Sequence, residues 1–226
     1  MPLTKSTGNM YPWVTHTHTH LGGECPHKCK YCYVDNPRWG RAPRYQGPLR
    51  LIEKEFTVDY GTEKTIFIEH MNDLFSRWIP QLFISAVMCH CIRFHGNTYV
   101  FQTKNPARYH TMEKLYPEKC IWGSTIETNR IIPGISEAPP PEERMLAMEK
   151  LTGRKFITIE PVLDFDVDIL ASWIDRIRPE FLNLGADSKN HNLPEPTVEK
   201  VMKFVDKLKE YGIELREKHN LKRLKL

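Results

Sequence analysis

The sequence predicts an α/β protein, a partial (βα)6 barrel with parallel strands in a single domain over residues 1–226. Short β-rich segments alternate with helical segments about six times, and proline and glycine separate them. Strands that alternate with helices form a parallel sheet with right-handed crossovers. No GxGxxG or GxxxxGK[ST] motif follows the first strand, so a nucleotide-binding α/β fold has no support. A chain of 226 residues that is 40% hydrophobic can bury one core, which excludes wholesale disorder.

The first half of the chain begins with a strand over residues 14–20, where β-branched residues and histidines alternate. Residues 21–47 are irregular and rich in glycine, proline and arginine. The later elements expected in this half are helix 49–56, strand 65–69, helix 80–94, strand 98–103 and helix 106–115, the last with a proline in its first turn.

The second half continues the alternation. We expect strand 120–126, a proline-rich loop, helix 142–151, strand 155–159, helix 167–178 and strand 180–184. The C-terminal helix and tail cover residues 196–226, with the helix itself over 196–211. In open or closed α/β sheets of this kind, active sites lie at the carboxyl ends of the strands. The loop after the first strand is therefore expected on the functional face.

Composition restricts the partners and the compartment. The net charge of +4, from 32 basic and 28 acidic residues, permits a polyanionic partner without requiring one. The chain has no run of about 18 apolar residues, and its first residues lack the apolar core of a signal peptide. We therefore expect a soluble, cytoplasmic protein with no membrane partner.

Three of the six cysteines crowd into eight residues of the loop 21–47, at Cys25, Cys29 and Cys32. Clusters of this density in an intracellular chain usually hold a metal. Thiolates so close together converge on one soft centre, either an iron–sulfur cluster or zinc.

The cysteine spacing, CxxxCxxC with Tyr31 before the last cysteine, resembles the signature of the radical S-adenosylmethionine (SAM) superfamily. Further segments resemble successive strand ends of a phage- and archaea-associated family in that superfamily, which is distantly similar to the DNA-repair enzyme spore photoproduct lyase. They are 65–76, 101–106, 122–129, 157–161 and 183–188, and the resemblance covers residues 14–226.

The resemblance implies a radical SAM-type barrel with a [4Fe-4S] cluster and SAM as cofactors. Three thiolates hold three irons and leave the fourth open for SAM. One electron from an external reductant, of flavodoxin or ferredoxin type, would cleave SAM to a 5′-deoxyadenosyl radical that abstracts hydrogen from the substrate.

The resemblance also implies a set of SAM-binding residues. Lys104 matches a strand-end lysine that contacts the SAM carboxylate in the photoproduct lyase group. The Gly-Gly-Glu segment that binds the SAM amine in many members is replaced here by residues 69–73, Glu-His-Met-Asn-Asp. The full expected set is Tyr31, Asp73, Thr103, Lys104, Ser124, Glu127, Asn129 and Glu160.

Other polar residues are expected to line the substrate side of the site, namely His20, Glu69, His70, Arg41 and Arg44. His16, His18 and His20 share one face of the first strand. They would either line the barrel interior or lie in solvent on an edge strand. The mixed basic and aromatic run 38–45 could clamp phosphate and stack a base, or could simply be loop packing. A nucleic acid substrate, for DNA modification or repair, is mainly what the family resemblance implies. A peptide or small-metabolite substrate stays open.

The main alternative is a zinc-binding, nucleic-acid-binding module, in which Cys25, His27, Cys29 and Cys32 hold zinc. Zinc sites generally combine two separated pairs of ligands, whereas these four lie in one short segment. The other cysteines, Cys89, Cys91 and Cys120, are expected to be buried small hydrophobic residues. Positions 89 and 91 fall on different helix faces, which disfavours joint chelation.

Overall fold

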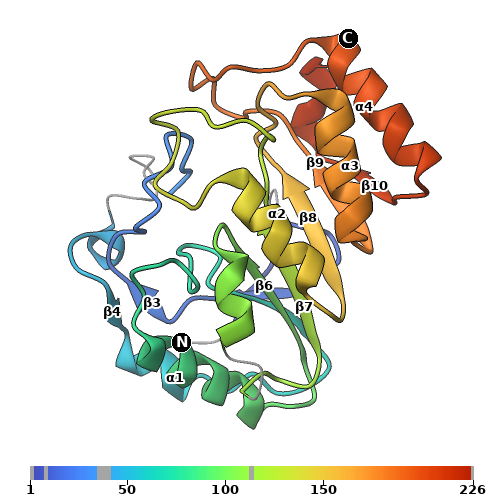
Figure 1. The fold of residues 1–226 in the computed structure, drawn as a ribbon. Coiled ribbons are helices and arrows are strands. Elements are labelled where there is room, and N and C mark those ends of the chain that lie inside the picture. The colour runs from blue at the N-terminus through green and yellow to red at the C-terminus, as the bar shows by residue number, and fades with distance from the viewer. Residues whose placement is uncertain (1–2, 8–9, 35–41, 112–114, 225–226) are drawn as a thin grey trace. The chain divides into compact units, whose positions relative to one another are not determined.

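The computed structural model describes residues 3–7, 10–34, 42–111 and 115–224 (Figure 1). Its main sheet has eight strands in the order β1-β2-β5-β6-β7-β8-β9-β10, and β3 and β4 form a separate pair. The pairs β2–β5, β5–β6, β8–β9 and β9–β10 are parallel, and β1 pairs with β2 antiparallel. The predicted mostly parallel α/β fold is confirmed.

The chain divides into two compact units. Unit 1 comprises residues 1–28, 32–103 and 108–122, and unit 2 comprises residues 29–31, 104–107 and 123–226. The single domain over residues 1–226 stays a prediction.

Unit 1 contains the strands of the first half and one long helix. Its elements are β1 (Thr4–Lys5), β2 (His16–His18), β3 (Leu21–Gly22), β4 (Arg50–Leu51), β5 (Thr65–Ile68), α1 (Gln81–Arg93), β6 (Thr98–Thr103) and the first residues of β7 (Cys120–Thr125). Its core contains the fully buried side chains of Ile66, Phe75, Val87, Met88 and Tyr99.

The described part of unit 2 contains three α-helices, which alternate with strands along the chain. Its elements are the end of β7, α2 (Pro141–Lys150), β8 (Lys155–Ile159), α3 (Val167–Ile177), β9 (Phe181–Leu184), α4 (Val198–Glu210) and β10 (Leu215–Glu217). Helix α3 contacts both α2 and α4 (Figure 1). The apolar faces of these helices bury Met148, Leu170, Ile174, Phe204 and Leu208.

The first parallel strand is shorter than predicted. After His18, the backbone N–H groups of His20 and Leu21 donate to the Glu69 carboxylate, at 2.6 and 3.2 Å, instead of extending the ladder with β5. This strand is not an edge strand either, because β1 pairs with it. His18 and His20 are accordingly buried, and the alternative of a solvated face is wrong for both.

Two predicted helices of the first half are wrong in detail. Residues 50–51 form strand β4, which pairs with residues 21–22. Only Glu53–Thr57 of the predicted helix is helical, and it is a 3₁₀ helix. A helix was also expected over residues 106–115, and there the described part is a 3₁₀ helix, Pro106–Thr111. The edge strands β1 and β10 were not predicted, since two or three residues carry no recognisable alternation.

The cysteines outside the loop differ from expectation at two positions. Cys91 is buried as predicted and Cys120 is half-buried, whereas Cys89 is exposed. Since both Cys89 and Cys91 lie in α1, their different exposure confirms that they occupy different helix faces. Within the described residues, no helix combines the length and apolar composition needed to cross a membrane.

Candidate active site

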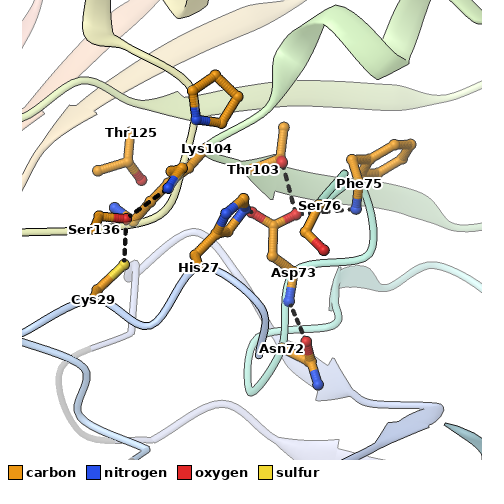
Figure 2. A network of polar contacts seen from close by, with 12 residues as sticks. His27, Cys29, Asn72, Asp73, Phe75, Ser76, Thr103, Lys104, Thr125 and Ser136 are labelled. Atoms are coloured by element: carbon orange, nitrogen blue, oxygen red, sulfur yellow. Dashed lines mark hydrogen bonds and ion pairs between the residues drawn. The ribbon is translucent and has the colours of Figure 1, made fainter. Parts of the chain in front are cut away.

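The cysteine loop of unit 1 is attached to the segment that follows β5. The imidazole of His27, which is buried, donates through Nε2 to Asp73 Oδ2 at 2.8 Å. Asp73 Oδ1 accepts the Thr103 hydroxyl at 2.6 Å and the Phe75 amide at 3.0 Å (Figure 2). The Tyr33 hydroxyl donates to the carbonyl of His70. The structure therefore brings together Asp73 and Thr103, two residues expected at the SAM site, and adds His27 to them.

A second group of polar residues in unit 1 surrounds Glu69, which follows β5 directly. Glu69 is buried and has φ 61°, a left-handed conformation that is uncommon outside glycine. Besides two backbone amides, its carboxylate accepts His20 Nδ1 at 2.8 Å. The other ring nitrogen of His20 contacts His90 Nδ1 at 2.8 Å and the Tyr60 hydroxyl at 3.0 Å.

Burial dominates the protonation of this group. It raises the pKa of Glu69 to about 7 and lowers the pKa of His20 to about 3, because the interior disfavours both charged forms. Burial also lowers the pKa of His70 to about 4. His20 was expected to line the substrate side, whereas in the structure it is fully buried.

Of the two arginines expected to contact substrate, Arg41 lies outside the described residues. Arg44 is half-buried and engaged within the chain: it pairs with Glu55 at 2.7 Å and donates to the carbonyl of Thr19. A phosphate at Arg44 would compete with Glu55 for the same guanidinium.

In unit 2, three donors meet at the buried carboxylate of Glu127, just beyond the end of β7. Lys104 Nζ lies 2.5 Å from Oε1, Arg144 lies 2.7 Å from Oε2, and the Tyr31 hydroxyl also donates to Oε1. Lys104 lies over the Tyr31 ring, 5.1 Å from its centroid. Burial alone would raise the pKa of Glu127, but Arg144 and Lys104 hold it well below its usual range.

Residues 29–31 of the cysteine loop belong to unit 2 and are attached there at three points. Cys29 Sγ lies 3.2 Å from Ser136 Oγ, and the Lys30 amide donates to the Ile135 carbonyl at 2.9 Å. Tyr31 supplies the third point through Glu127. Figure 2 shows the contact between Cys29 and Ser136.

The remaining expected SAM residues have separate surroundings. Ser124 is buried in β7. Asn129 exchanges hydrogen bonds with Asp166, the residue that precedes α3, at 3.1 and 2.8 Å. Glu160 accepts from Asn220 at 2.9 Å, and a side chain at Gly185 would collide with both. Their predicted roles stay predictions.

Sequence reasoning missed Arg144, and it considered His27 only as a zinc ligand. Arg144 lies in the first turn of a helix after three prolines, where nothing distinguishes it from other helical arginines. His27 lies between two of the cysteines, and that position was the one signal that could have identified it.

No protein-family model matches this chain, and no curated protein matches it. Among solved structures, a spore photoproduct lyase variant has a TM-score of 0.65 at 12% identity, over 95% of this chain and 80% of the lyase. Another variant of that lyase, with bound AdoMet and dinucleoside spore photoproduct, has a TM-score of 0.64 at 11% identity, over 93% of this chain and 78% of the lyase.

SuiB of Streptococcus suis, bound to the precursor peptide SuiA, has a TM-score of 0.61 at 9% identity, over 93% of this chain and half of SuiB. Spore photoproduct lyase and SuiB are radical SAM enzymes. Across nearly its whole length, this chain has the fold of radical SAM enzymes.

Proposed function

We propose that this protein is a radical SAM enzyme, in which Cys25, Cys29 and Cys32 hold a [4Fe-4S] cluster and SAM is the second cofactor. The observation that carries the proposal is the CxxxCxxC loop that follows β2, the first parallel strand, in a fold shared with radical SAM enzymes. When bound, the reduced cluster and SAM supply a 5′-deoxyadenosyl radical for hydrogen abstraction.

The donor set fits such a cluster. Cys25, Cys29 and Cys32 are half-buried thiols. The backbone turns after Cys25, where the Lys28 amide approaches the Cys25 carbonyl at 3.5 Å and Lys28 has φ 45°. Three thiols suit a cubane with one open iron better than a closed tetrahedral site.

The chain's own residues would hold the loop and the SAM molecule. His27, Asp73 and Thr103 fix the loop in unit 1, and Tyr31 and Ser136 fix it in unit 2. Lys104, a cation at the end of β6, suits the carboxylate of SAM. An external one-electron reductant of flavodoxin or ferredoxin type would deliver the electron.

Anaerobic reconstitution with iron and sulfide tests the cluster. We expect about four irons and four sulfides per chain, and loss of both in Cys25→Ala, Cys29→Ala and Cys32→Ala. Cys89→Ala is the matched control, because it removes an exposed thiol from α1. A protein that binds one zinc and no sulfide would contradict the proposal.

A second candidate, a zinc-binding module that acts on nucleic acid without radical chemistry, is favoured by one observation. His27 donates to a buried carboxylate, as histidine ligands of zinc commonly do. The same metal analysis separates the two candidates, and His27→Gln would abolish zinc binding only in the second.

We further propose that the substrate is a nucleic acid, with DNA modification or repair as the reaction. Support comes from the fold shared with a lyase that binds a dinucleoside photoproduct and from the net charge of +4. To test this, the enzyme is reduced chemically in the presence of SAM and deuterated DNA. Deuterium in 5′-deoxyadenosine is expected, whereas transfer only from a peptide would contradict the nucleic acid and favour the substrate type of SuiB.

A further inference from the structure

The buried carboxylate of Glu127 in unit 2 accepts from three side chains. Oε1 accepts Lys104 Nζ at 2.5 Å and the Tyr31 hydroxyl, and Oε2 accepts Arg144 at 2.7 Å. The Glu127 residue is 3% exposed. A carboxylate with these three donors has little capacity left to bind the amine or the ribose of a ligand.

Arg144 is itself fixed before it reaches Glu127. Its Nε donates to the Pro139 carbonyl at 2.6 Å, and its NH1 donates to the Thr125 carbonyl at 3.1 Å as well as to Glu127. The residue is 4% exposed. A planar guanidinium held at both ends places the carboxylate in one position.

The two other partners of Glu127 are the ones expected to contact SAM. Tyr31 lies between Cys29 and Cys32, and Lys104 follows β6. The ammonium of Lys104 also lies 5.1 Å from the centroid of the Tyr31 ring. Any movement of Glu127 would therefore move the tyrosine of the cysteine loop and the lysine together.

We propose that Glu127 and Arg144 are positioning residues of the SAM site: Arg144 fixes Glu127, and Glu127 holds Tyr31 and Lys104 in the orientation that receives SAM. This role rests on the proposed function and replaces direct SAM contact as the expected role of Glu127. Removal of the groups that hold binding side chains in place weakens ligand binding, even though no contact with the ligand is lost.

Hydrogen exchange of the metal-free protein tests the first half of the proposal. In Tyr31→Phe, which removes one hydroxyl, amides of residues 29–32 should exchange roughly tenfold faster than in the wild type. Arg144→Lys should act in the same direction, because lysine keeps the positive charge but lacks the planar set of N–H donors that arginine has. Unchanged exchange in both variants would overturn the anchoring of the loop through Glu127.

SAM affinity of the reconstituted protein tests the second half, through the change in the electron paramagnetic resonance spectrum on SAM addition. Tyr31→Phe and Arg144→Lys should each weaken SAM binding roughly tenfold. The double variant should also lose roughly tenfold rather than a hundredfold, since both act through Glu127. Arg176→Lys is the matched control, because Arg176 forms an exposed two-point pair with Glu149 in the same unit.

The outcomes separate this inference from the proposed function. A wild-type protein without an iron–sulfur cluster contradicts the proposed function. A wild-type protein that binds cluster and SAM, alongside Tyr31→Phe and Arg144→Lys variants of unchanged affinity, contradicts the positioning role alone. Weakened binding with fully additive losses would mean that Tyr31 and Arg144 act separately, which also overturns it.

Discussion

Glu69 and Glu127 are both buried carboxylates that follow strands of the main sheet, yet their surroundings shift their pKa values in opposite directions. Around Glu69, burial prevails over two backbone amides and raises the pKa to about 7. Around Glu127, Arg144 and Lys104 outweigh burial and lower the pKa. Glu69 can therefore exchange a proton near neutral pH, whereas Glu127 stays a fixed anion.

Lys104 gives a prediction at the scale of a single residue. Lys104→Ala should leave the iron and sulfide content unchanged but weaken SAM binding by roughly 1.5–3 kcal/mol, the usual contribution of a hydrogen bond to a charged group. Glu127 keeps Arg144 as its partner in this variant, so the fold should persist.

Calorimetric titration of the reconstituted variant with SAM measures this loss. Lys200→Ala is a suitable control, because Lys200 also pairs with a carboxylate in unit 2, at 2.6 Å from Asp164. Equal SAM affinity in the wild type and Lys104→Ala would show that Lys104 does not bind SAM.

At the scale of elements, the long periodic segments could be predicted from the sequence and the short pairings could not. Helices α1, α2, α3 and α4 lie within about two residues of their predicted bounds, and β6 and β8 match theirs. Residues 49–56 have a helical pattern, but the pairing of residues 50–51 with residues 21–22 depends on a contact distant in sequence. Tertiary pairing of this kind overrides local propensity.

The candidate site shows the same limit. Asp73, in the segment after β5, and Thr103, the last residue of β6, were both expected at the SAM site, and they are hydrogen-bonded. Arg144 was not expected, because its partner Glu127 lies 17 residues earlier and only the path of the chain through α2 joins them. The spacing of a sequence motif predicts which residues bind the cofactor. It does not predict which residues, such as Arg144, position those side chains.

Gly123 in β7 gives a prediction at the scale of a strand. A Cβ atom at this position would lie 2.2 Å from Cζ of Phe156 in β8, closer than real contacts allow. Gly123→Ala should therefore destabilise the protein by about 1–3 kcal/mol, the usual cost of overpacking a core.

Urea denaturation measures the effect on the free energy of unfolding. Gly123→Ala combined with Phe156→Leu should recover part of the loss, because leucine leaves room at that point. A single variant with the wild-type midpoint would mean that the sheet accommodates the methyl group.

At the scale of the whole molecule, buried histidines make stability depend on pH. Burial lowers the pKa of His18 and His20 to about 3 and that of His90 to about 4, from an ordinary value of 6.5. Between these limits the unfolded chain binds more protons than the folded chain, so stability falls as pH falls below 6.5. Burial lowers the pKa of His70 to about 4 as well, so the raised pKa of Glu69, which has the opposite effect between pH 4.5 and 7, is one group against four.

The free energy of unfolding should therefore decrease as the pH is lowered from 6.5 toward 4. His18→Gln should reduce the slope by about 1.4 kcal/mol per pH unit, the contribution of one proton. Denaturation series at several pH values give the slopes. A wild-type stability that is flat between pH 6.5 and 4 would contradict the expected effect of the buried histidines.

The central claim is that this fold and its three-cysteine loop perform radical SAM chemistry, and reductive cleavage of SAM tests it most directly. The reconstituted wild-type protein, given dithionite and SAM without oxygen, should release 5′-deoxyadenosine and methionine, as measured by mass spectrometry. Cys32→Ala should release neither, and Cys89→Ala should match the wild type. A wild-type protein with its full complement of iron and sulfide that releases no 5′-deoxyadenosine, or a Cys32→Ala variant that releases as much, would contradict the claim.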